Sequence, residues 1–372
     1  MSDEKPLGLG LIGCGSFGLF CLEAFATMPE VRISAVADSR ASAAETAGRR
    51  FDAAVHTDWR ELLAREDVDI AHIATPPSSH HELVLAALHA GKHVLCEKPL
   101  AMNTAQADEM LAAAERAGRI APVNFVMRHN AVASAAGQII SSRALGKPLA
   151  GRLTNCAFDT YMPPEHWFWD HSVSGGIFVE HGVHFFDLHS QWLGPASVLS
   201  AHTEKREGSG VEDRVTCRLH HEGGAVVSHY HGFDQIEPMD RADHRIICEL
   251  GEVRVFGWIP MRLEVEAAVN DETQQRIEQC CDGCEVETLR DLSGEPDGLV
   301  GRGKQRDVTR IIRLTWQPFD DKGATYAESI RTLLADQIAF IRDPSHQREV
   351  TERHGRDALA LAQQASQMAA DG

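Results

Sequence analysis

Short apolar runs alternate with alanine-rich stretches along the first third of the chain. The apolar runs have the length and aliphatic content of buried strands, and they lie at residues 7–13, 31–38, 67–75, 93–99 and 119–126. The stretches between them have the apolar spacing of helices, at residues 17–28, 80–90 and 104–117 and in a segment that ends near Arg50. Strands separated by helices of this length predict right-handed crossovers and a mostly parallel sheet.

Beyond about residue 145 the pattern changes to the two-residue alternation of half-buried strands. Residues 215–233 form two alternating runs joined by Glu222, Gly223 and Gly224, which is a hairpin signal. Residues 245–257 repeat this pattern with Gly251 at the turn. Further strands are expected at residues 262–268 and 308–316, and helices at 325–342 and 353–369.

This change of pattern predicts two domains. Residues 1–124 are expected to form an N-terminal α/β domain, and residues 125–372 an α+β domain with a large, mostly antiparallel open sheet. A chain of 372 residues is also longer than one ordinary hydrophobic core requires. We expect the last helix to pack back towards the N-terminal domain.

Charge and hydropathy exclude several classes of protein. The chain has 54 acidic and 36 basic residues, and the net charge of −18 has the wrong sign for binding a nucleic-acid backbone. No apolar run approaches the roughly 20 residues that cross a bilayer. The first residues lack the charged, apolar and cleavage regions of a signal peptide. We therefore expect a cytoplasmic protein with neither a nucleic-acid nor a membrane partner.

The nine cysteines are odd in number and scattered, which is typical of reduced thiols in a cytosolic protein. Cys280, Cys281 and Cys284 form their only cluster. A single C-x-x-C hook supplies half of a zinc site, and no second hook follows it. We therefore predict no metal.

A glycine-rich turn joins the first predicted strand to the first predicted helix. Gly13 allows the tight turn, Gly15 lets the backbone approach a pyrophosphate, and Gly18 allows close packing of helix on strand. The helix N-terminus that follows would bind the diphosphate. The cofactor contacts predicted from this dinucleotide-binding fingerprint of a Rossmann domain are Gly13, Gly15, Ser16, Phe17 and Gly18.

Asp38 lies twenty residues beyond Gly18, at the end of the second predicted strand. A carboxylate there accepts hydrogen bonds from ribose hydroxyls and repels a 2′-phosphate, which favours NAD over NADP. Arg40 follows two residues later, and a guanidinium there is able to accommodate part of that phosphate. NADP therefore stays open as the second candidate.

Two further motifs lie in residues 75–101. Thr75, Pro76 and His80 form T-P-x-x-x-H, and Glu97 and Lys98 open E-K-P after G-K-H-V. Together with the glycine fingerprint, these motifs resemble the Gfo/Idh/MocA oxidoreductases, the family of glucose–fructose oxidoreductase and inositol dehydrogenase. The resemblance covers the entire chain.

The resemblance implies roles for these motifs. Lys98 would reach the reacting hydroxyl beside the nicotinamide, and Glu97 would contact the cofactor ribose. Thr75, Pro76 and His80 are expected to line the cofactor. Asn124, at the end of the strand predicted at 119–126, is expected to approach the nicotinamide amide.

A second family hallmark, G-G-x-x-x-D-x-x-x-H-x-x-D, matches residues 175–187 with Glu180 in place of its first Asp. The spacing of Glu180, His184 and Asp187 places them on one helical face. By resemblance His184 is the catalytic acid/base, and Glu180 is the third catalytic residue and binds substrate. Glu180 keeps the carboxylate but is one methylene longer than Asp. This difference affects which substrate is expected more than which reaction is expected.

Alcohol oxidation requires the chemistry that these residues offer. An imidazole removes the hydroxyl proton while hydride leaves to the nicotinamide, and an ammonium stabilises the developing alkoxide. A metal is the alternative use of the histidines near Glu180. Neighbouring helical positions such as Glu180 and His181 point apart, which disfavours a shared ion.

Four residues are further candidates for substrate binding. Arg128 follows the strand at the domain junction, where a substrate contact and a surface salt bridge stay equally open. Tyr161, His166 and Trp167 precede the glycine-glycine pair. They suit stacking on a sugar, although packing in the core remains the alternative use of such aromatic residues.

The preferred interpretation is an NAD(P)-dependent dehydrogenase that acts on CH–OH groups of a sugar, a polyol or a related cyclic alcohol. One alternative is an NAD-dependent glycosidase-type hydrolase that oxidises its substrate transiently. A non-catalytic sugar or NAD sensor is less favoured, because Lys98 and His184 are both present. A homo-oligomer, dimer or tetramer, is expected because one apolar sheet face would lack helices to cover it.

Overall fold

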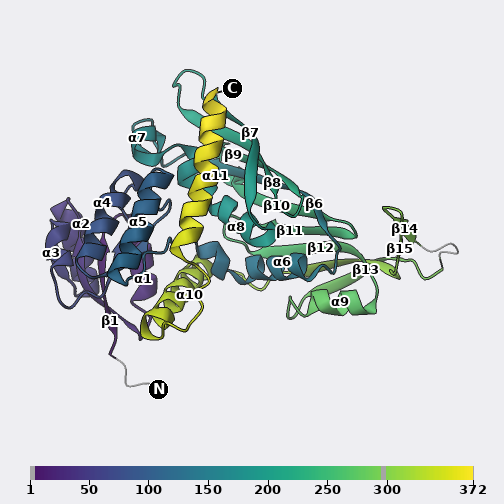
Figure 1. The fold of residues 1–372 in the computed structure, drawn as a ribbon, viewed down its shortest axis with the longest axis horizontal. Coiled ribbons are helices and arrows are strands. Elements are labelled where there is room, and N and C mark those ends of the chain that lie inside the picture. The colour runs from purple at the N-terminus through teal and green to yellow at the C-terminus, as the bar shows by residue number, and fades with distance from the viewer. Residues whose placement is uncertain (1–4, 295–298, 372) are drawn as a thin grey trace. The chain divides into compact units, whose positions relative to one another are not determined.

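The computed structural model describes residues 5–294 and 299–371 (Figure 1). The chain forms two compact units, each assembled from several segments. The first unit contains the described parts of Met1–His129, Glu165–Asp187 and Tyr326–Gln363. The second unit contains those of Asn130–Pro164, Leu188–Thr325 and Gln364–Gly372.

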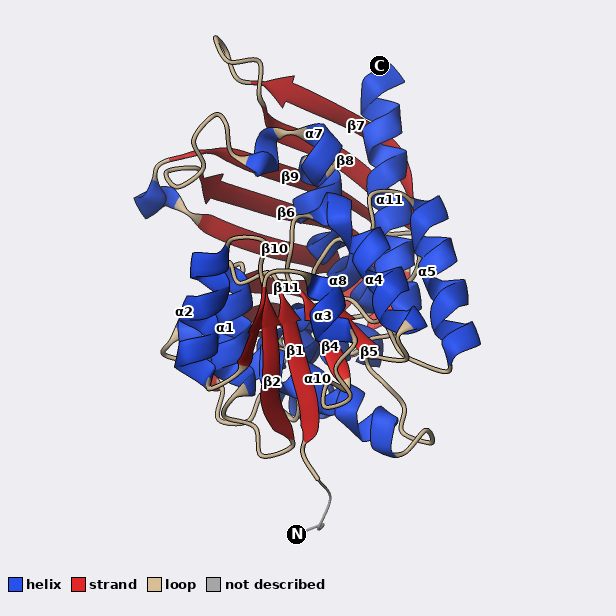
Figure 2. Cartoon of the chain, turned by 90° about the vertical axis from the view of Figure 1, so that its left-hand side faces the viewer, coloured by secondary structure: helices blue, strands red, loops and turns tan. Residues whose placement is uncertain are grey.

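A parallel five-stranded sheet forms the centre of the first unit, with the strand order β3-β2-β1-β4-β5. Its strands are β1 (Leu7–Ile12), β2 (Val31–Ala37), β3 (Ala54–His56), β4 (Ile70–Ile73) and β5 (His93–Cys96). The helices between them are α1 (Ser16–Phe25), α2 (Ala41–Phe51), α3 (Trp59–Leu63), α4 (His80–His89) and α5 (Thr104–Ala117). Helices α1 and α2 lie on one side of the sheet and α4 and α5 on the other (Figure 2). The predicted Rossmann-type α/β architecture is confirmed.

Helix α5 shows how local sequence sets the ends of an element. The Asn103 side chain accepts a hydrogen bond from the Gln106 N–H and caps the helix at its start. Gly118 adopts a left-handed conformation with φ +59° and ends it. The helix therefore begins and ends where the sequence predicted.

The strand predicted at 119–126 is wrong, because only Val123 forms an isolated bridge, to Cys96. The segment still lies beside β5, since Cys96 N–H donates to Pro122 O and Asn124 N–H donates to Cys96 O. Pro122 has no N–H to donate, and residues Val126–His129 turn into a short 3-10 helix. The segment nevertheless brings Asn124 to the carboxyl end of β5.

The second unit contains a nine-stranded sheet with the order β13-β16-β12-β11-β10-β6-β9-β8-β7. Among the described residues of this sheet only β6 and β9 pair in parallel, so the predicted large, mostly antiparallel sheet is confirmed. The strands are β6 (Pro148–Phe158), β7 (Ala196–Lys205), β8 (Glu212–His221), β9 (Val226–Gln235), β10 (Arg241–Cys248), β11 (Gly251–Phe256), β12 (Arg262–Val269), β13 (Glu285–Asp291) and β16 (Arg310–Trp316). A separate hairpin joins β14 (Leu299–Gly301) and β15 (Lys304–Arg306).

The remaining helices are α6 (Ala131–Ser142), α7 (His171–Ser174), α8 (Val183–Leu193), α9 (Asp271–Glu278), α10 (Lys322–Arg342) and α11 (Glu352–Asp371). The two predicted C-terminal helices correspond to α10 and α11. In the described part of the chain, no helix combines the length and the apolar character needed to cross a membrane.

The outward face of the large sheet is polar. Along β8, Val215, Cys217 and Leu219 point into the core, while Thr216 and Arg218 between them are exposed. Ion pairs join neighbouring strands on this outward face. Arg245 of β10 contacts Glu252 of β11, and Arg313 Nη2 of β16 lies 3.2 Å from Glu266 Oε2 of β12. The expectation of an apolar outward face is therefore wrong, since alternation places arginine and glutamate there.

A chain of buried histidines lies in the core of the second unit. His189 Nδ1 lies 3.1 Å from His229 Nε2, and His189 Nε2 lies 3.0 Å from His244 Nδ1. The His231 ring lies next to His229, with 5.7 Å between the ring centroids. Burial lowers the pKa of all four imidazoles, and it brings those of His231 and His244 to about 3. The four side chains are therefore neutral in the folded protein near pH 7.

Candidate active site

The glycine-rich turn between β1 and α1 leaves space in front of the helix. A Cβ on Gly13, at φ +99°, would lie 2.5 Å from Ala74 O, and one on Gly18 would lie 2.3 Å from Gly13 O. A Cβ on Gly15 would meet no atom within 4 Å in the described structure. Gly15 is also the N-cap of α1 and makes no side-chain capping bond. A diphosphate fits at this end, where the first-turn N–H groups point.

Asp38 lies next to this turn, as predicted. Its carboxylate accepts hydrogen bonds from the backbone N–H groups of Cys14 and Arg40, both at 2.9 Å. Burial acts to raise the Asp38 pKa, but the hydrogen bonds from Arg40 and Cys14 outweigh it and lower the pKa. The Arg40 side chain is 68% exposed and also contacts this carboxylate. An ionised acid therefore borders the glycine turn.

The T-P-x-x-x-H segment joins two loops of the sheet edge. The buried His80 ring places Nδ1 2.7 Å from Pro99 O and Nε2 2.9 Å from Thr75 O. The Thr75 hydroxyl bonds to that of Ser79, while Pro76 is exposed. His80 thus connects the loop after β4 to the loop after β5, and its contact with a cofactor stays a prediction.

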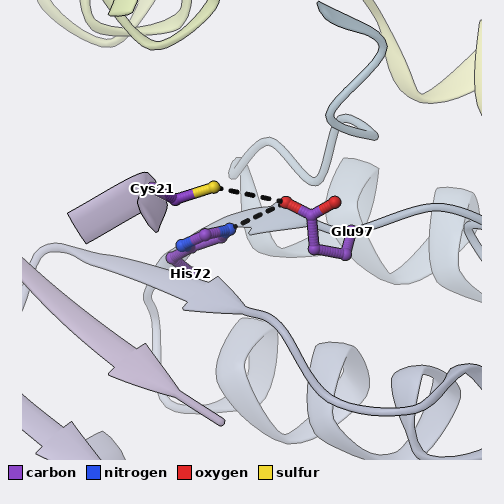
Figure 3. A group of neighbouring side chains, drawn as sticks. All are labelled: Cys21, His72 and Glu97. Carbon is purple, nitrogen blue, oxygen red and sulfur yellow. Dashed lines mark hydrogen bonds and ion pairs between the residues drawn. The ribbon is translucent and has the colours of Figure 1, made fainter. Parts of the chain in front are cut away.

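Glu97 is buried at the end of β5 and interacts with three other elements. Its Oε1 accepts a hydrogen bond from Asn124 Nδ2 at 2.8 Å and lies 3.1 Å from His72 Nε2 and 4.0 Å from Cys21 Sγ (Figure 3). The buried Asn124 Oδ1 has no hydrogen-bond partner among the described residues, so it is available to a ligand donor. The sequence analysis missed His72 and Cys21. A histidine within an aliphatic strand was the available signal.

Lys98 meets the helix that begins after Gly175 and Gly176. Its ammonium contacts the Glu180 carboxylate and also donates to Glu180 O at 3.0 Å. The Lys98–Pro99 peptide bond is cis. Residues Phe178–Gly182 form a π-helical turn before α8, and this wider turn carries Glu180. The loop after β5 and the glycine-glycine segment therefore bring Lys98 against Glu180.

His184 follows on α8 in the same unit and is buried. Burial first, and then the charge of Lys98, holds the pKa of His184 well below its ordinary value. The ring lies 6.1 Å from that of Phe125, between centroids. A neutral imidazole near an ammonium has the protonation state that a general base needs.

Tyr326 of α10 is a second residue that the sequence analysis missed. Its ring lies 5.8 Å from Phe17 and 5.2 Å from Phe20, between centroids. Burial, followed by the charges of Glu97, Cys21 and Glu180, raises the pKa of its hydroxyl well above the ordinary value. The Tyr326 hydroxyl therefore stays neutral, and it lies within electrostatic reach of Glu97 and Glu180.

Arg128 forms a buried ion pair. Its Nε and Nη2 donate to the two Asp187 oxygens at 2.7 and 2.8 Å. Burial raises the Asp187 pKa despite the Arg128 charge. Of the two interpretations, an ion pair is observed, although in the core rather than on the surface. A substrate contact by Arg128 stays a prediction.

The aromatic candidates fall into different units. His166 and Trp167 belong to the first unit, are half-buried and have ring centroids 5.3 Å apart. Tyr161 belongs to the second unit, where the residue is 73% exposed and its ring faces that of Phe158. Their contacts with substrate stay predictions.

The cysteine cluster at the end of α9 contains free thiols. Cys281 is buried, and burial raises the pKa of its thiol to about 12, while Cys280 and Cys284 are half-buried. Of the residues described, only Cys21, His72 and Glu97 bring three possible metal-ligand atoms within 4.8 Å of one another. The cluster at 280–284 is not such a group.

Two family models match this chain. Residues 7–125 match "Oxidoreductase family, NAD-binding Rossmann fold", and residues 133–254 match "GFO/IDH/MocA C-terminal domain". The 1,5-anhydro-D-fructose reductase of Ensifer adhaerens is 33% identical over 183 residues, 48% of this chain and 54% of that protein. The D-apiose dehydrogenase of Paraburkholderia graminis is 32% identical over 220 residues, 58% of each chain. The matches thus span little more than half the length of these relatives.

Solved structures share the fold along the entire chain. The WlbA dehydrogenase from Bordetella pertussis, in complex with NADH and UDP-GlcNAcA, superposes with a TM-score of 0.79 at 20% identity. The match covers 100% of this chain and 97% of that one. With both family models matched, the chain belongs to the Gfo/Idh/MocA oxidoreductase family.

Proposed function

We propose that this protein is an NAD-dependent dehydrogenase that transfers a hydride between nicotinamide and a hydroxyl-bearing carbon of a sugar, polyol or related cyclic alcohol. The observation that carries the proposal is the group formed by Lys98, Glu180 and His184 in one compact unit with the glycine turn. The names of the two relatives, a reductase and a dehydrogenase that act on sugars, support the same substrate class.

The chain offers several groups to NAD. The open space at Gly15 suits the diphosphate, the Asp38 carboxylate suits ribose hydroxyls, and the buried Asn124 Oδ1 suits an amide donor. Bound NAD would supply the hydride acceptor. The other residues proposed to line it are Gly13, Ser16, Phe17, Gly18, Arg40, Thr75, Pro76, His80, Glu97 and Lys98.

The protein's own groups would handle the substrate hydroxyl. Neutral His184 accepts the hydroxyl proton, because its depressed pKa keeps the ring unprotonated before reaction. The Lys98 ammonium stabilises the negative charge that grows on the oxygen. Glu180 holds Lys98 before substrate binds and would exchange this contact for a substrate hydroxyl.

Asp38→Ala is expected to narrow the preference for NADH over NADPH by about tenfold or more, since one lost charged hydrogen bond is of that size. Removing the carboxylate also frees Arg40, which now contacts Asp38, to meet a 2′-phosphate. Fluorescence titration with both dinucleotides measures the change. Glu45→Ala, on the exposed surface of α2, is the control. Tighter binding of NADPH than of NADH by the wild type would contradict the prediction.

A panel of sugars, polyols and glycosides, incubated with and without NAD, tests the proposed reaction. Net NADH formation with an oxidised product supports a dehydrogenase. Cleavage of a glycoside without net NADH would identify the hydrolase alternative. Absence of saturable binding of any nicotinamide dinucleotide would overturn the proposal.

We further propose that residues 1–124 bind the cofactor, that residues 125–372 bind substrate and mediate assembly, and that the protein acts in the cytoplasm. All nine cysteines are free thiols, which supports a reducing compartment.

Light scattering at micromolar concentration is expected to give a homo-oligomer. The nine-stranded sheet presents a broad outward face that carries Arg313, Glu266, Glu252 and Arg245 on the neighbouring strands β16, β12, β11 and β10. Such a face is complementary to a second copy of itself across a two-fold axis. Salt screens exposed charges, and the Debye length is about 10 Å at 0.1 M. The oligomer should therefore dissociate more readily at about 1 M salt than at about 0.05 M salt. A strict monomer at low salt would refute this assembly.

A further inference from the structure

His72 lies in the middle of the parallel sheet, on β4, and is fully buried. Its Nε2 lies 3.1 Å from Glu97 Oε1, the oxygen that also accepts the hydrogen bond from Asn124 at 2.8 Å. Cys21 Sγ approaches the same oxygen at 4.0 Å. Figure 3 shows Cys21 and His72 both directed towards this one atom.

The two oxygens of Glu97 therefore have different surroundings. Every hydrogen bond that Glu97 accepts through its side chain, within residues 5–294 and 299–371, reaches Oε1. The side chain retains 8% exposure. Oε2 is consequently the oxygen that remains available to a ligand.

The surroundings of the other ring nitrogen decide which tautomer His72 adopts. His72 Nδ1 is buried and has no hydrogen-bond partner among the described residues. The edge-to-face contact with the Phe25 ring, at 5.4 Å between centroids, shows the apolar side of this pocket. A proton on Nδ1 would leave a buried donor without an acceptor, which is costly. The favoured tautomer carries its proton on Nε2 and donates it to Glu97.

We propose that His72 is a positioning residue, which together with Asn124 fixes Oε1 of Glu97 and so presents Oε2 alone to a bound nicotinamide dinucleotide. This inference rests on the proposed function. A carboxylate held by two donors has lost its rotational freedom before the ligand arrives, and binding then costs less ordering entropy. His72 never touches the ligand in this arrangement, because all of its polar contact is with Glu97.

The affinity for NADH, measured by fluorescence titration, tests the inference. His72→Leu keeps the bulk but removes the donor, and it is expected to weaken NADH binding up to about tenfold, the scale of immobilising one additional side chain on binding. His72→Gln keeps a donor and should stay within about threefold of the wild type. His93→Leu, a histidine at the other end of the neighbouring strand β5, is the matched control and should change affinity less than about twofold.

A double-mutant cycle separates positioning from a general structural effect. In a Glu97→Ala background nothing is left to position, so His72→Leu should change NADH affinity less than about twofold. An equal loss in both backgrounds, or no loss in the wild-type background, would overturn the inference. A failure of the proposed function is distinct, since the wild type itself would then bind no nicotinamide dinucleotide.

Two measurements on the wild-type protein keep the inference testable if His72→Leu does not fold. Nitrogen NMR of the histidine rings should show His72 protonated on Nε2 alone, and a proton on Nδ1 would contradict the donor role. Elemental analysis addresses the metal alternative for Cys21, His72 and Glu97. One equivalent of zinc per chain would overturn hydrogen-bonded positioning, and its absence from zinc-supplemented protein is the expected result.

Discussion

Replacing Lys98 or His184 by alanine is expected to lower kcat by about two to four orders of magnitude, the usual scale for an electrostatic or acid/base group. The reason is that each would act on the same hydroxyl. His184→Ala removes the neutral base, and Lys98→Ala removes the positive charge beside the developing alkoxide. Cofactor affinity should change little, because neither side chain is proposed to hold the adenosine half. Steady-state kinetics on the substrate found in the panel, together with NADH titration, measure both.

Glu180→Gln is the informative companion. It keeps the shape of the side chain and loses the charge that contacts Lys98, so it should act mainly on substrate KM. Lys322→Ala, an exposed lysine at the start of α10, serves as the control and should leave kcat unchanged. If the chemistry is glycoside cleavage, Lys98→Ala and His184→Ala should stop hydrolysis without any net NADH. Near wild-type turnover by either variant would defeat the catalytic assignment.

Acid is expected to destabilise the second unit well above the pH at which carboxylates titrate. The imidazoles of His231 and His244 have pKa values of about 3 in the folded protein, far below the value of 6.5 for an unperturbed histidine. Below pH 6.5 the unfolded chain therefore binds protons that the folded chain excludes. The stability that these neutral rings contribute is complete above pH 6.5 and is lost as the pH falls towards 3.

The size of this effect follows from the pH interval. Between pH 6.5 and 5 each of these two histidines should reduce the free energy of unfolding by about 2 kcal/mol, at about 1.4 kcal/mol for each pH unit. Urea unfolding at pH 7, 6 and 5 measures the decline. The variant His231→Leu should lose about 2 kcal/mol less unfolding free energy over this interval, because its unfolded chain no longer binds a proton at position 231. His202→Gln, on an exposed histidine beside Glu204, is the control and should leave the pH dependence unchanged. A pH-independent free energy of unfolding over this range would disprove the prediction.

Many elements of both units were predicted from local sequence, although strands such as β3, β6 and β7 were not. Asn103 and Gly118 mark the ends of α5, and the alternation of Val215, Cys217 and Leu219 marks β8, because caps and periodicity act within a few residues. The strand at 119–126 failed for an equally local reason, since Pro122 removes a donor. The polar outward face of the large sheet was misjudged although it follows from the same alternation, which places Thr216 and Arg218 opposite the buried residues of β8.

The residues of the candidate site were also largely visible in the sequence. The glycine turn, Asp38, Lys98, Glu180 and His184 stand in motifs whose spacing matches a known family, and the structure brings Lys98 against Glu180. His72 and Tyr326 belong to no such motif. Their place beside Glu97 appears only when strands and helices from distant parts of the chain pack together.

By itself the sequence determined the change from an α/β pattern to antiparallel strands, the dinucleotide fingerprint and the identity of the catalytic candidates. Only the tertiary structure decided their partners. Arg128 pairs with Asp187, which lies 59 residues away in the sequence. His189 contacts His229 and His244, which lie 40 and 55 residues away. The physical reason is that a buried polar group must find its partner wherever the packed chain places one. Periodicity reports only whether a side chain faces the core, and not which group it meets there.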